Sequence, residues 1–122
     1  MTIRTNGDDN GYVSIPELSL VTPTFTSNNY TAVLADKDKF VQLSNSSTAG
    51  TFTIPENSSV PFPIGAQINM TQSGSGQITI TPVNGNVTIN SSSGLKLRTQ
   101  WSSATIVKRA TNTWLIFGDL SA

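Results

Sequence analysis

The chain has 122 residues, a length typical of one domain, and its seven basic and seven acidic residues cancel to a net charge of +0. Without a basic excess it has no electrostatic footprint for nucleic acid or for an anionic membrane, so neither is an expected partner. The absence of cysteine and histidine excludes disulfides, thiol nucleophiles, and every catalytic triad or metal site that requires a histidine.

Residue usage favours strands over helices. Ser, Thr and Asn account for 44 residues, whereas charged residues make up only 11%. No window places apolar residues at i, i+3, i+4 and i+7 over three turns, which an amphipathic helix requires. Turn signals recur at roughly 8–12 residues, the spacing of sandwich and jelly-roll folds. The sequence therefore predicts an all-β protein, an antiparallel β-sandwich of jelly-roll-like type.

Residues 1–27 differ from the rest of the chain. Pro16 and Pro23 interrupt the segment, and its apolar residues follow no clean strand period. These apolar residues are Tyr12, Val13, Ile15, Leu18 and Leu20. We interpret residues 1–27 as an extended arm that attaches to another subunit or another protein, and residues 28–122 as the β-sandwich module. An ordinary first strand, packed within its own chain, is an equal alternative.

Residues 65–90 show the clearest strand pattern. Ile68 and Met70, then Ile78 and Ile80, alternate with polar residues, as do Val87 and Ile89. Period-2 alternation places the aliphatic residues on one face of a sheet. Asn84-Gly85 is a strong hairpin signal, because a type I′ turn needs positive φ at both central residues. The stretch therefore predicts a three-stranded antiparallel meander.

Residues 113–118, Thr-Trp-Leu-Ile-Phe-Gly, are apolar on both faces of the expected strand. One small sandwich covers both faces of a strand only near its centre, so we expect a neighbouring subunit to cover one of them. The predicted oligomer interface comprises Trp101, Trp114, Ile116 and Phe117.

The acidic residues are the candidates for catalysis and metal binding, since paired carboxylates can hydrolyse glycosides. They are Asp8, Asp9, Glu17, Asp36, Asp38, Glu56 and Asp119. All lie in or beside turn signals, where acidic residues are common. Asp36-Lys37-Asp38 resembles the start of a calcium loop, but Phe40, Val41 and Gln42 follow where further oxygen ligands and a glycine are needed. We predict no catalytic residue, no metal site and no cofactor.

Several runs in the second half carry a family resemblance. They are FTIP at 52–55, VPFPIGAQI at 60–68, GSGQITITP at 74–82, VTIN at 87–90, LKLRTQWSSATIVKR at 95–109 and TWLIFGDL at 113–120. In this order they resemble a β-rich module of tailed-bacteriophage virion proteins, including fibre-type and cyanophage structural proteins. The resemblance covers residues 30–120 and implies a trimeric, non-enzymatic module on the outer surface of a virion, assembled in the host bacterial cytoplasm.

Three functions are compatible with these observations. The first is a homotrimeric capsid decoration (cement) protein that binds the major capsid protein. The second is a short tail-fibre or receptor-binding tip, attached to a tail or fibre protein, that recognises host-surface glycan through Trp101 and exposed Asn or Thr side chains. The third and weakest is a glycan-cleaving spike built on the acidic residues above. The number of copies in each virion separates the first two.

Overall fold

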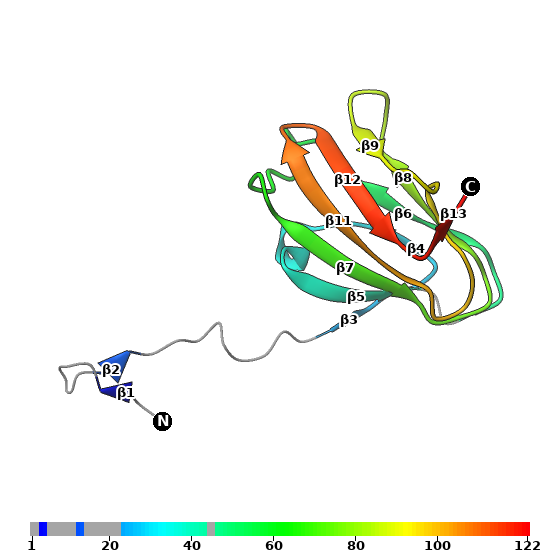
Figure 1. Cartoon of the computed structure of the whole chain (residues 1–122), viewed down its shortest axis with the longest axis horizontal. Helices are drawn as coiled ribbons and strands as arrows, with labels where there is room; N and C mark the ends of the chain where they lie inside the picture. Colours follow the sequence, from blue (N-terminus) through cyan, green and yellow to red (C-terminus); the bar gives the residue numbers. More distant parts are fainter. Residues whose placement is uncertain (1–2, 5–11, 14–22, 44–45) are drawn as a thin grey trace.

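The computed structural model describes residues 3–4, 12–13, 23–43 and 46–122, which form an all-β fold with no α-helix in those ranges (Figure 1). One turn of 3-10 helix, η2 (Leu34–Asp36), lies between β4 and β5. The strands are β1 (Ile3–Arg4), β2 (Tyr12–Val13), β3 (Thr24–Phe25), β4 (Asn29–Thr31), β5 (Lys39–Leu43), β6 (Gly50–Ile54), β7 (Gln67–Gln72), β8 (Ile78–Pro82), β9 (Thr88–Asn90), β10 (Lys96–Leu97), β11 (Ser103–Ala110), β12 (Thr113–Gly118) and β13 (Leu120–Ser121).

Two mixed sheets form the two layers that face each other in Figure 1. The six-stranded sheet has the order β3-β5-β7-β11-β12-β9, and the five-stranded sheet has the order β13-β10-β8-β6-β4. A single apolar core lies between them. Its largest members from the six-stranded sheet are Leu43, Ile68, Met70, Ile106, Trp114 and Ile116, and those from the five-stranded sheet are Phe52, Ile54, Ile78, Ile80 and Leu97.

The antiparallel arrangement expected from the sequence holds for only part of the fold. From β3 to β8 the chain alternates between the sheets, so β3, β5 and β7 run parallel in one and β4, β6 and β8 run parallel in the other. The later strands add antiparallel pairs: β11 joins β7 to β12, and β10 joins β8 to β13. Strand β9 then pairs with β12 in parallel.

The predicted meander over residues 65–90 is therefore wrong, although its strands and their inward faces are confirmed. Strands β7 and β8 belong to different sheets, and the turn at Ser73–Gly76 crosses from one layer to the other. Ile68, Met70, Ile78 and Ile80 all have 0% of their surface exposed. Alternation identified the buried face of each strand correctly. The two strands, however, face each other across the core from opposite sheets and do not lie side by side in one sheet.

The Asn84-Gly85 hairpin is also absent, because neither residue has the positive φ that a type I′ turn requires. The Asn84 side chain instead accepts a hydrogen bond from the backbone N–H of Asn86 at 2.9 Å. The amides of Asn84 and Asn86 each donate to one carboxylate oxygen of Glu56, both at 2.9 Å. These amide–carboxylate bonds fix the loop against the turn after β6, so the chain continues to β9 in the other sheet.

The six-stranded sheet begins before the expected boundary at residue 28. Strand β3 pairs in parallel with β5, joining Thr24 to Val41 and Phe25 to Gln42, and the Thr26 N–H donates to Gln42 O at 3.0 Å. In the expected arm, Tyr12–Val13 is strand β2, which pairs with β1. Ile15, Leu18 and Leu20 lie outside the described residues.

Candidate interaction surface

The last long strand, β12, exposes one of its two faces. Alternation points Trp114 and Ile116 into the core, where each is 1% exposed. Leu115 and Phe117 point outward and are 40% and 52% exposed. Of the predicted interface residues, Trp114 and Ile116 are thus already buried by their own chain, and Phe117 and Trp101 remain on its surface. One apolar face of this strand is thus left partly uncovered by its own chain, and its coverage by a neighbouring subunit stays a prediction.

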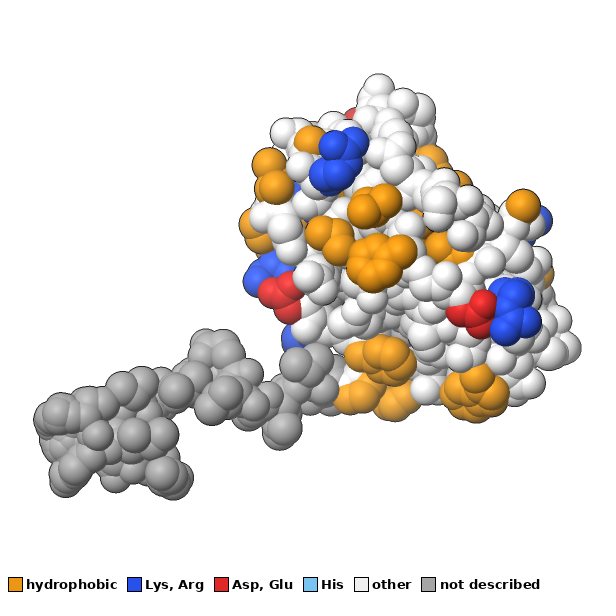
Figure 2. Space-filling view, in the orientation of Figure 1, with side chains coloured by type: hydrophobic (Ala, Val, Ile, Leu, Met, Phe, Trp, Pro, Cys, Tyr) orange, Lys and Arg blue, Asp and Glu red, His pale blue; other side chains and the backbone are white. Residues whose placement is uncertain are grey.

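Further apolar side chains share this outer face of the six-stranded sheet. In register, Leu115 lies beside Val107, and Phe117 lies beside Thr105. The same row continues through Asn69 to Phe40 on β5. Phe25, on the edge strand, is 69% exposed. Figure 2 shows apolar side chains gathered over β11 and β12 on this side of the molecule. We call this surface, from Phe25 to Phe117, the outer face.

The polar positions near the centre of the outer face carry no charge, whereas Arg109 is exposed at an outward position at the end of β11. Thr105 Oγ1 donates to Asn69 Oδ1 at 2.7 Å, and Ser103 Oγ donates to Thr71 Oγ1 at 3.0 Å. Gln42 and Gln67 occupy further outward positions on β5 and β7. Charged groups lie at the rim, where Lys37 and Asp38 form an exposed ion pair at 2.9 Å. The outer face is therefore an apolar and amide-rich surface inside a charged border.

A second surface feature is the turn that displays Trp101. The Ser102 N–H donates to Thr99 O at 3.0 Å, which closes a four-residue turn with Trp101 in its third position. Trp101 has φ +69 there, as a type II turn requires, but that position normally holds Gly. A non-glycine residue in the left-handed region costs about 1–2 kcal/mol. The indole is nevertheless 62% exposed.

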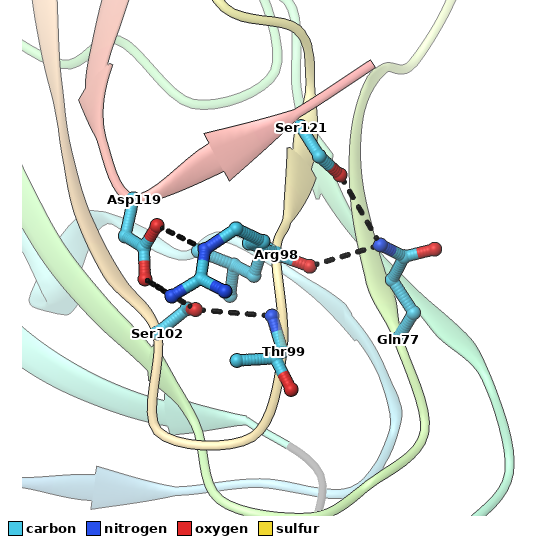
Figure 3. Close-up of polar contacts among 7 residues, drawn as sticks. Gln77, Arg98, Thr99, Ser102, Asp119 and Ser121 are labelled. Carbon is cyan, nitrogen blue, oxygen red and sulfur yellow. Dashed lines mark hydrogen bonds and ion pairs between the residues drawn. The ribbon is translucent and has the colours of Figure 1, made fainter.

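An ion pair fixes the base of this turn (Figure 3). Arg98 Nε donates to Asp119 Oδ1 at 2.7 Å, and its Nη2 donates to Oδ2 at 3.0 Å. Ser102 Oγ donates to the same Oδ2 at 2.7 Å and accepts from the Thr99 N–H at 3.0 Å. The hydrogen bonds that Asp119 accepts lower the pKa of its carboxyl group. The bonds from Arg98 have the largest effect, and the bond from Ser102 adds to it. Nearby, Gln77 Nε2 donates to Leu97 O and Ser121 Oγ, which ties β10 to β13.

The remaining acidic residues of the described ranges have structural partners. Asp36 is buried and accepts from Tyr30 Oη at 2.8 Å and from the Val33 N–H at 3.0 Å. Glu56 holds the Asn84–Asn86 loop, as described above. Within residues 23–43 and 46–122, no group of three His, Cys, Asp or Glu residues is placed to hold a metal ion. Asp8, Asp9 and Glu17 lie outside the described residues.

Sequence reasoning did not identify Phe25, Phe40, Val107 and Leu115 as surface apolar residues. The alternation of side chains along a strand could have identified Leu115. On β12, Leu115 and Phe117 point to one face of the sheet, and Trp114 and Ile116 point to the other. Sequence reasoning also missed Lys108, a buried cation. Lys108 Nζ donates to Asn57 Oδ1 at 2.5 Å and to Phe62 O at 2.7 Å, and burial lowers its pKa.

Comparison with protein-family models and with curated proteins finds no match. Among the described residues, no helix has the length and apolar character needed to cross a membrane.

Proposed function

We propose that this chain is a non-enzymatic structural protein of a bacteriophage virion, a homotrimer that decorates the capsid surface. The observation that carries the proposal is the outer face, where Phe25, Leu115 and Phe117 are exposed together with uncharged amides and hydroxyls. Leu115 and Phe117 are neighbours on β12, and Phe25 lies at the far edge of the same sheet. Large exposed apolar side chains on one sheet face, with polar residues around them, are typical of an interaction site.

A second copy of the chain is the occupant that this chemistry favours. The outward positions of β5, β7 and β12 carry no charge, and the one charged outward position of β11 is Arg109 at the end of the strand, so the central parts of identical faces meet without like-charge repulsion. Fully burying a large apolar side chain stabilises an interface by about 1.5–3 kcal/mol. In a cyclic trimer, the outer faces of three copies meet around the axis, and the five-stranded sheets face outward.

Attachment to the particle is assigned to residues preceding β3. The resemblance of residues 30–120 to phage virion modules supports a place on the virion, and residues 1–22 lie outside that resemblance. Their partner in this proposal is the major capsid protein. The trimer then presents its loops to the medium and its arms to the capsid.

The oligomer is tested by measuring the mass of the full chain by light scattering at micromolar concentration. The wild-type chain is expected to give about three times the 13.0 kDa of one chain. Leu115→Asp with Phe117→Asp places two carboxylates in the outer face and is expected to give a monomer. Val83→Asp is the matched control, because Val83 is 48% exposed and follows β8 of the other sheet.

A monomeric wild-type chain would refute the trimer, as would a double variant that keeps the wild-type mass. Circular dichroism must show that the double variant is folded. Co-sedimentation with undecorated capsids then tests the location, and saturation at hundreds of copies on each particle supports decoration of the head.

A further inference from the structure

Trp101 has a position and a conformation that the fold itself does not require. The close ring pairs among the described residues are Tyr30 with Phe52 and Phe62 with Trp114, and neither includes Trp101. The indole is 62% exposed, and its backbone has φ +69, where glycine is preferred. A largely exposed aromatic residue held in a costly backbone conformation is a candidate for a functional contact.

Hydrogen bonds fix the backbone of the turn that carries the indole. The Trp101 N–H donates to Gln72 O at 2.6 Å, and Gln100 Nε2 donates to Ser73 O at 3.0 Å. The Arg98–Asp119 ion pair lies at the base of the turn, with side chains that are 58% and 43% exposed. A ligand that stacks on the ring therefore meets a pre-organised surface and loses little free energy in ordering it.

We propose that Trp101 and the Arg98–Asp119 pair form a binding site for a neutral pyranose unit of an oligosaccharide. The face of the indole carries negative electrostatic potential, which attracts the polarised C–H groups on the face of a pyranose. Arg98 donates to Asp119 through Nε and Nη2, which leaves its Nη1 hydrogens for sugar hydroxyl groups. The Asp119 oxygens retain acceptor capacity for the same hydroxyls.

The charge of the site favours a neutral sugar over an acidic one. Arg98 and Asp119 form two hydrogen bonds with each other, so the pair has no net charge. An acidic sugar would meet the Asp119 carboxylate without a free cation to compensate it. A pyranose also matches the size of a single ring, whereas a protein partner needs about 800 Å² on each side.

The experiment applies the labelled full chain to an array of neutral and acidic bacterial polysaccharides and oligosaccharides. The strongest neutral oligosaccharide is then titrated, with indole fluorescence as the readout. Trp114 is 1% exposed, so a change in fluorescence reports on Trp101. We expect Trp101→Phe to bind within about tenfold of wild type, since it keeps an aromatic face.

Trp101→Gly is the decisive variant, followed by calorimetric titration because it lacks the fluorescent ring. Glycine accepts the positive φ, so the turn and the melting temperature are expected to be kept while sugar affinity falls by more than about tenfold. The inference is overturned if no neutral sugar binds the wild-type chain better than Trp101→Gly. It is also overturned if Trp101→Gly loses capsid binding while the array shows no sugar. The mass of the oligomer is measured separately, so failure here is distinct from failure of the trimer.

Discussion

At the scale of single residues, the described part of the chain holds buried polar groups by hydrogen bonds rather than by ion pairs. Asp36 is one example: it accepts at 2.8 Å from the hydroxyl of half-buried Tyr30, whose ring stacks on Phe52 with 5.9 Å between centroids. Asp36 in turn fixes η2 by accepting from the Val33 N–H. The pair therefore connects β4 to the turn before β5.

This pair predicts a loss of stability at alkaline pH. Burial, and then the bond to Asp36, raise the pKa of Tyr30 well above its ordinary value of 10.0. A raised pKa in the folded state means that the stabilisation is complete below about pH 10 and declines as pH rises further, because the unfolded chain then loses a proton that the folded chain keeps. We expect the Tyr30 contribution to the free energy of unfolding to be level from pH 8 to about 9.5 and to fall above it, whereas the lowered pKa of Lys108 contributes in the opposite direction.

Tyr30→Phe is the control for this pH dependence. It removes the titrating group, so its alkaline decline should be shallower than that of the wild type in urea titrations at each pH. It also leaves buried Asp36 without one donor, which should cost about 1–3 kcal/mol at neutral pH. Parallel alkaline profiles for the two proteins would show that another group titrates.

At the scale of elements, strands were predictable from the sequence but their pairing was not. The alternation of Ile68 with Met70 and of Ile78 with Ile80 specifies an inward face whichever sheet the strand joins. Parallel pairing of β5 with β7 joins residues far apart in the sequence, such as Lys39 and Ile68, and no local turn signal encodes it. The local residue pair Asn84-Gly85 indicated a hairpin. The contacts with Glu56 that hold this loop in another conformation depend on tertiary structure, so the local sequence does not encode them.

Of the two surface features, one was predictable from the sequence and the other was not. The open face of β12 followed from its apolar composition, because a strand that is apolar on both sides exceeds what one small core can bury. The left-handed backbone conformation of Trp101 did not follow, since it depends on the Thr99–Ser102 turn and on the hydrogen bond to Gln72 O.

The loops that lead into β6 and β8 give a prediction about stability. The loop before β8 packs against the loop before β6, where the Gly76 N–H donates to Ser46 O at 3.0 Å. A Cβ on Gly76 would lie 2.1 Å from Thr48 O, so either loop would have to move. We expect Gly76→Ala to lower the free energy of unfolding by about 1–3 kcal/mol in urea titrations.

Gly85→Ala is the matched control, because a Cβ at Gly85 meets nothing within 4 Å and the residue does not have positive φ. Alanine there should leave stability unchanged or raise it by about 0.4–1 kcal/mol. Equal effects of the two substitutions would mean that the loops do not pack as closely as the backbone indicates.

At the scale of the whole molecule, the start of the six-stranded sheet separates the strands of the two large sheets from the proposed attachment arm. Strand β3 begins at Thr24, and β1 with β2 forms a separate two-stranded sheet. Removing residues 2–22 therefore deletes no strand of either large sheet. Removing residues 2–27 deletes β3 as well, together with its pairing to β5 and the bond from the Thr26 N–H to Gln42 O.

The two truncations are expected to behave differently. The chain without residues 2–22 should melt within a few degrees of wild type and keep the trimer mass, because the sheets and the outer face are unchanged. It should no longer co-sediment with undecorated capsids, since the proposed attachment arm is missing. The chain without residues 2–27 should melt lower, because the edge of β5 loses its partner and Phe25 is lost from the outer face. Capsid binding that survives the shorter deletion would instead assign attachment to the β-module itself, and insolubility after it would show that residues preceding β3 are part of the core.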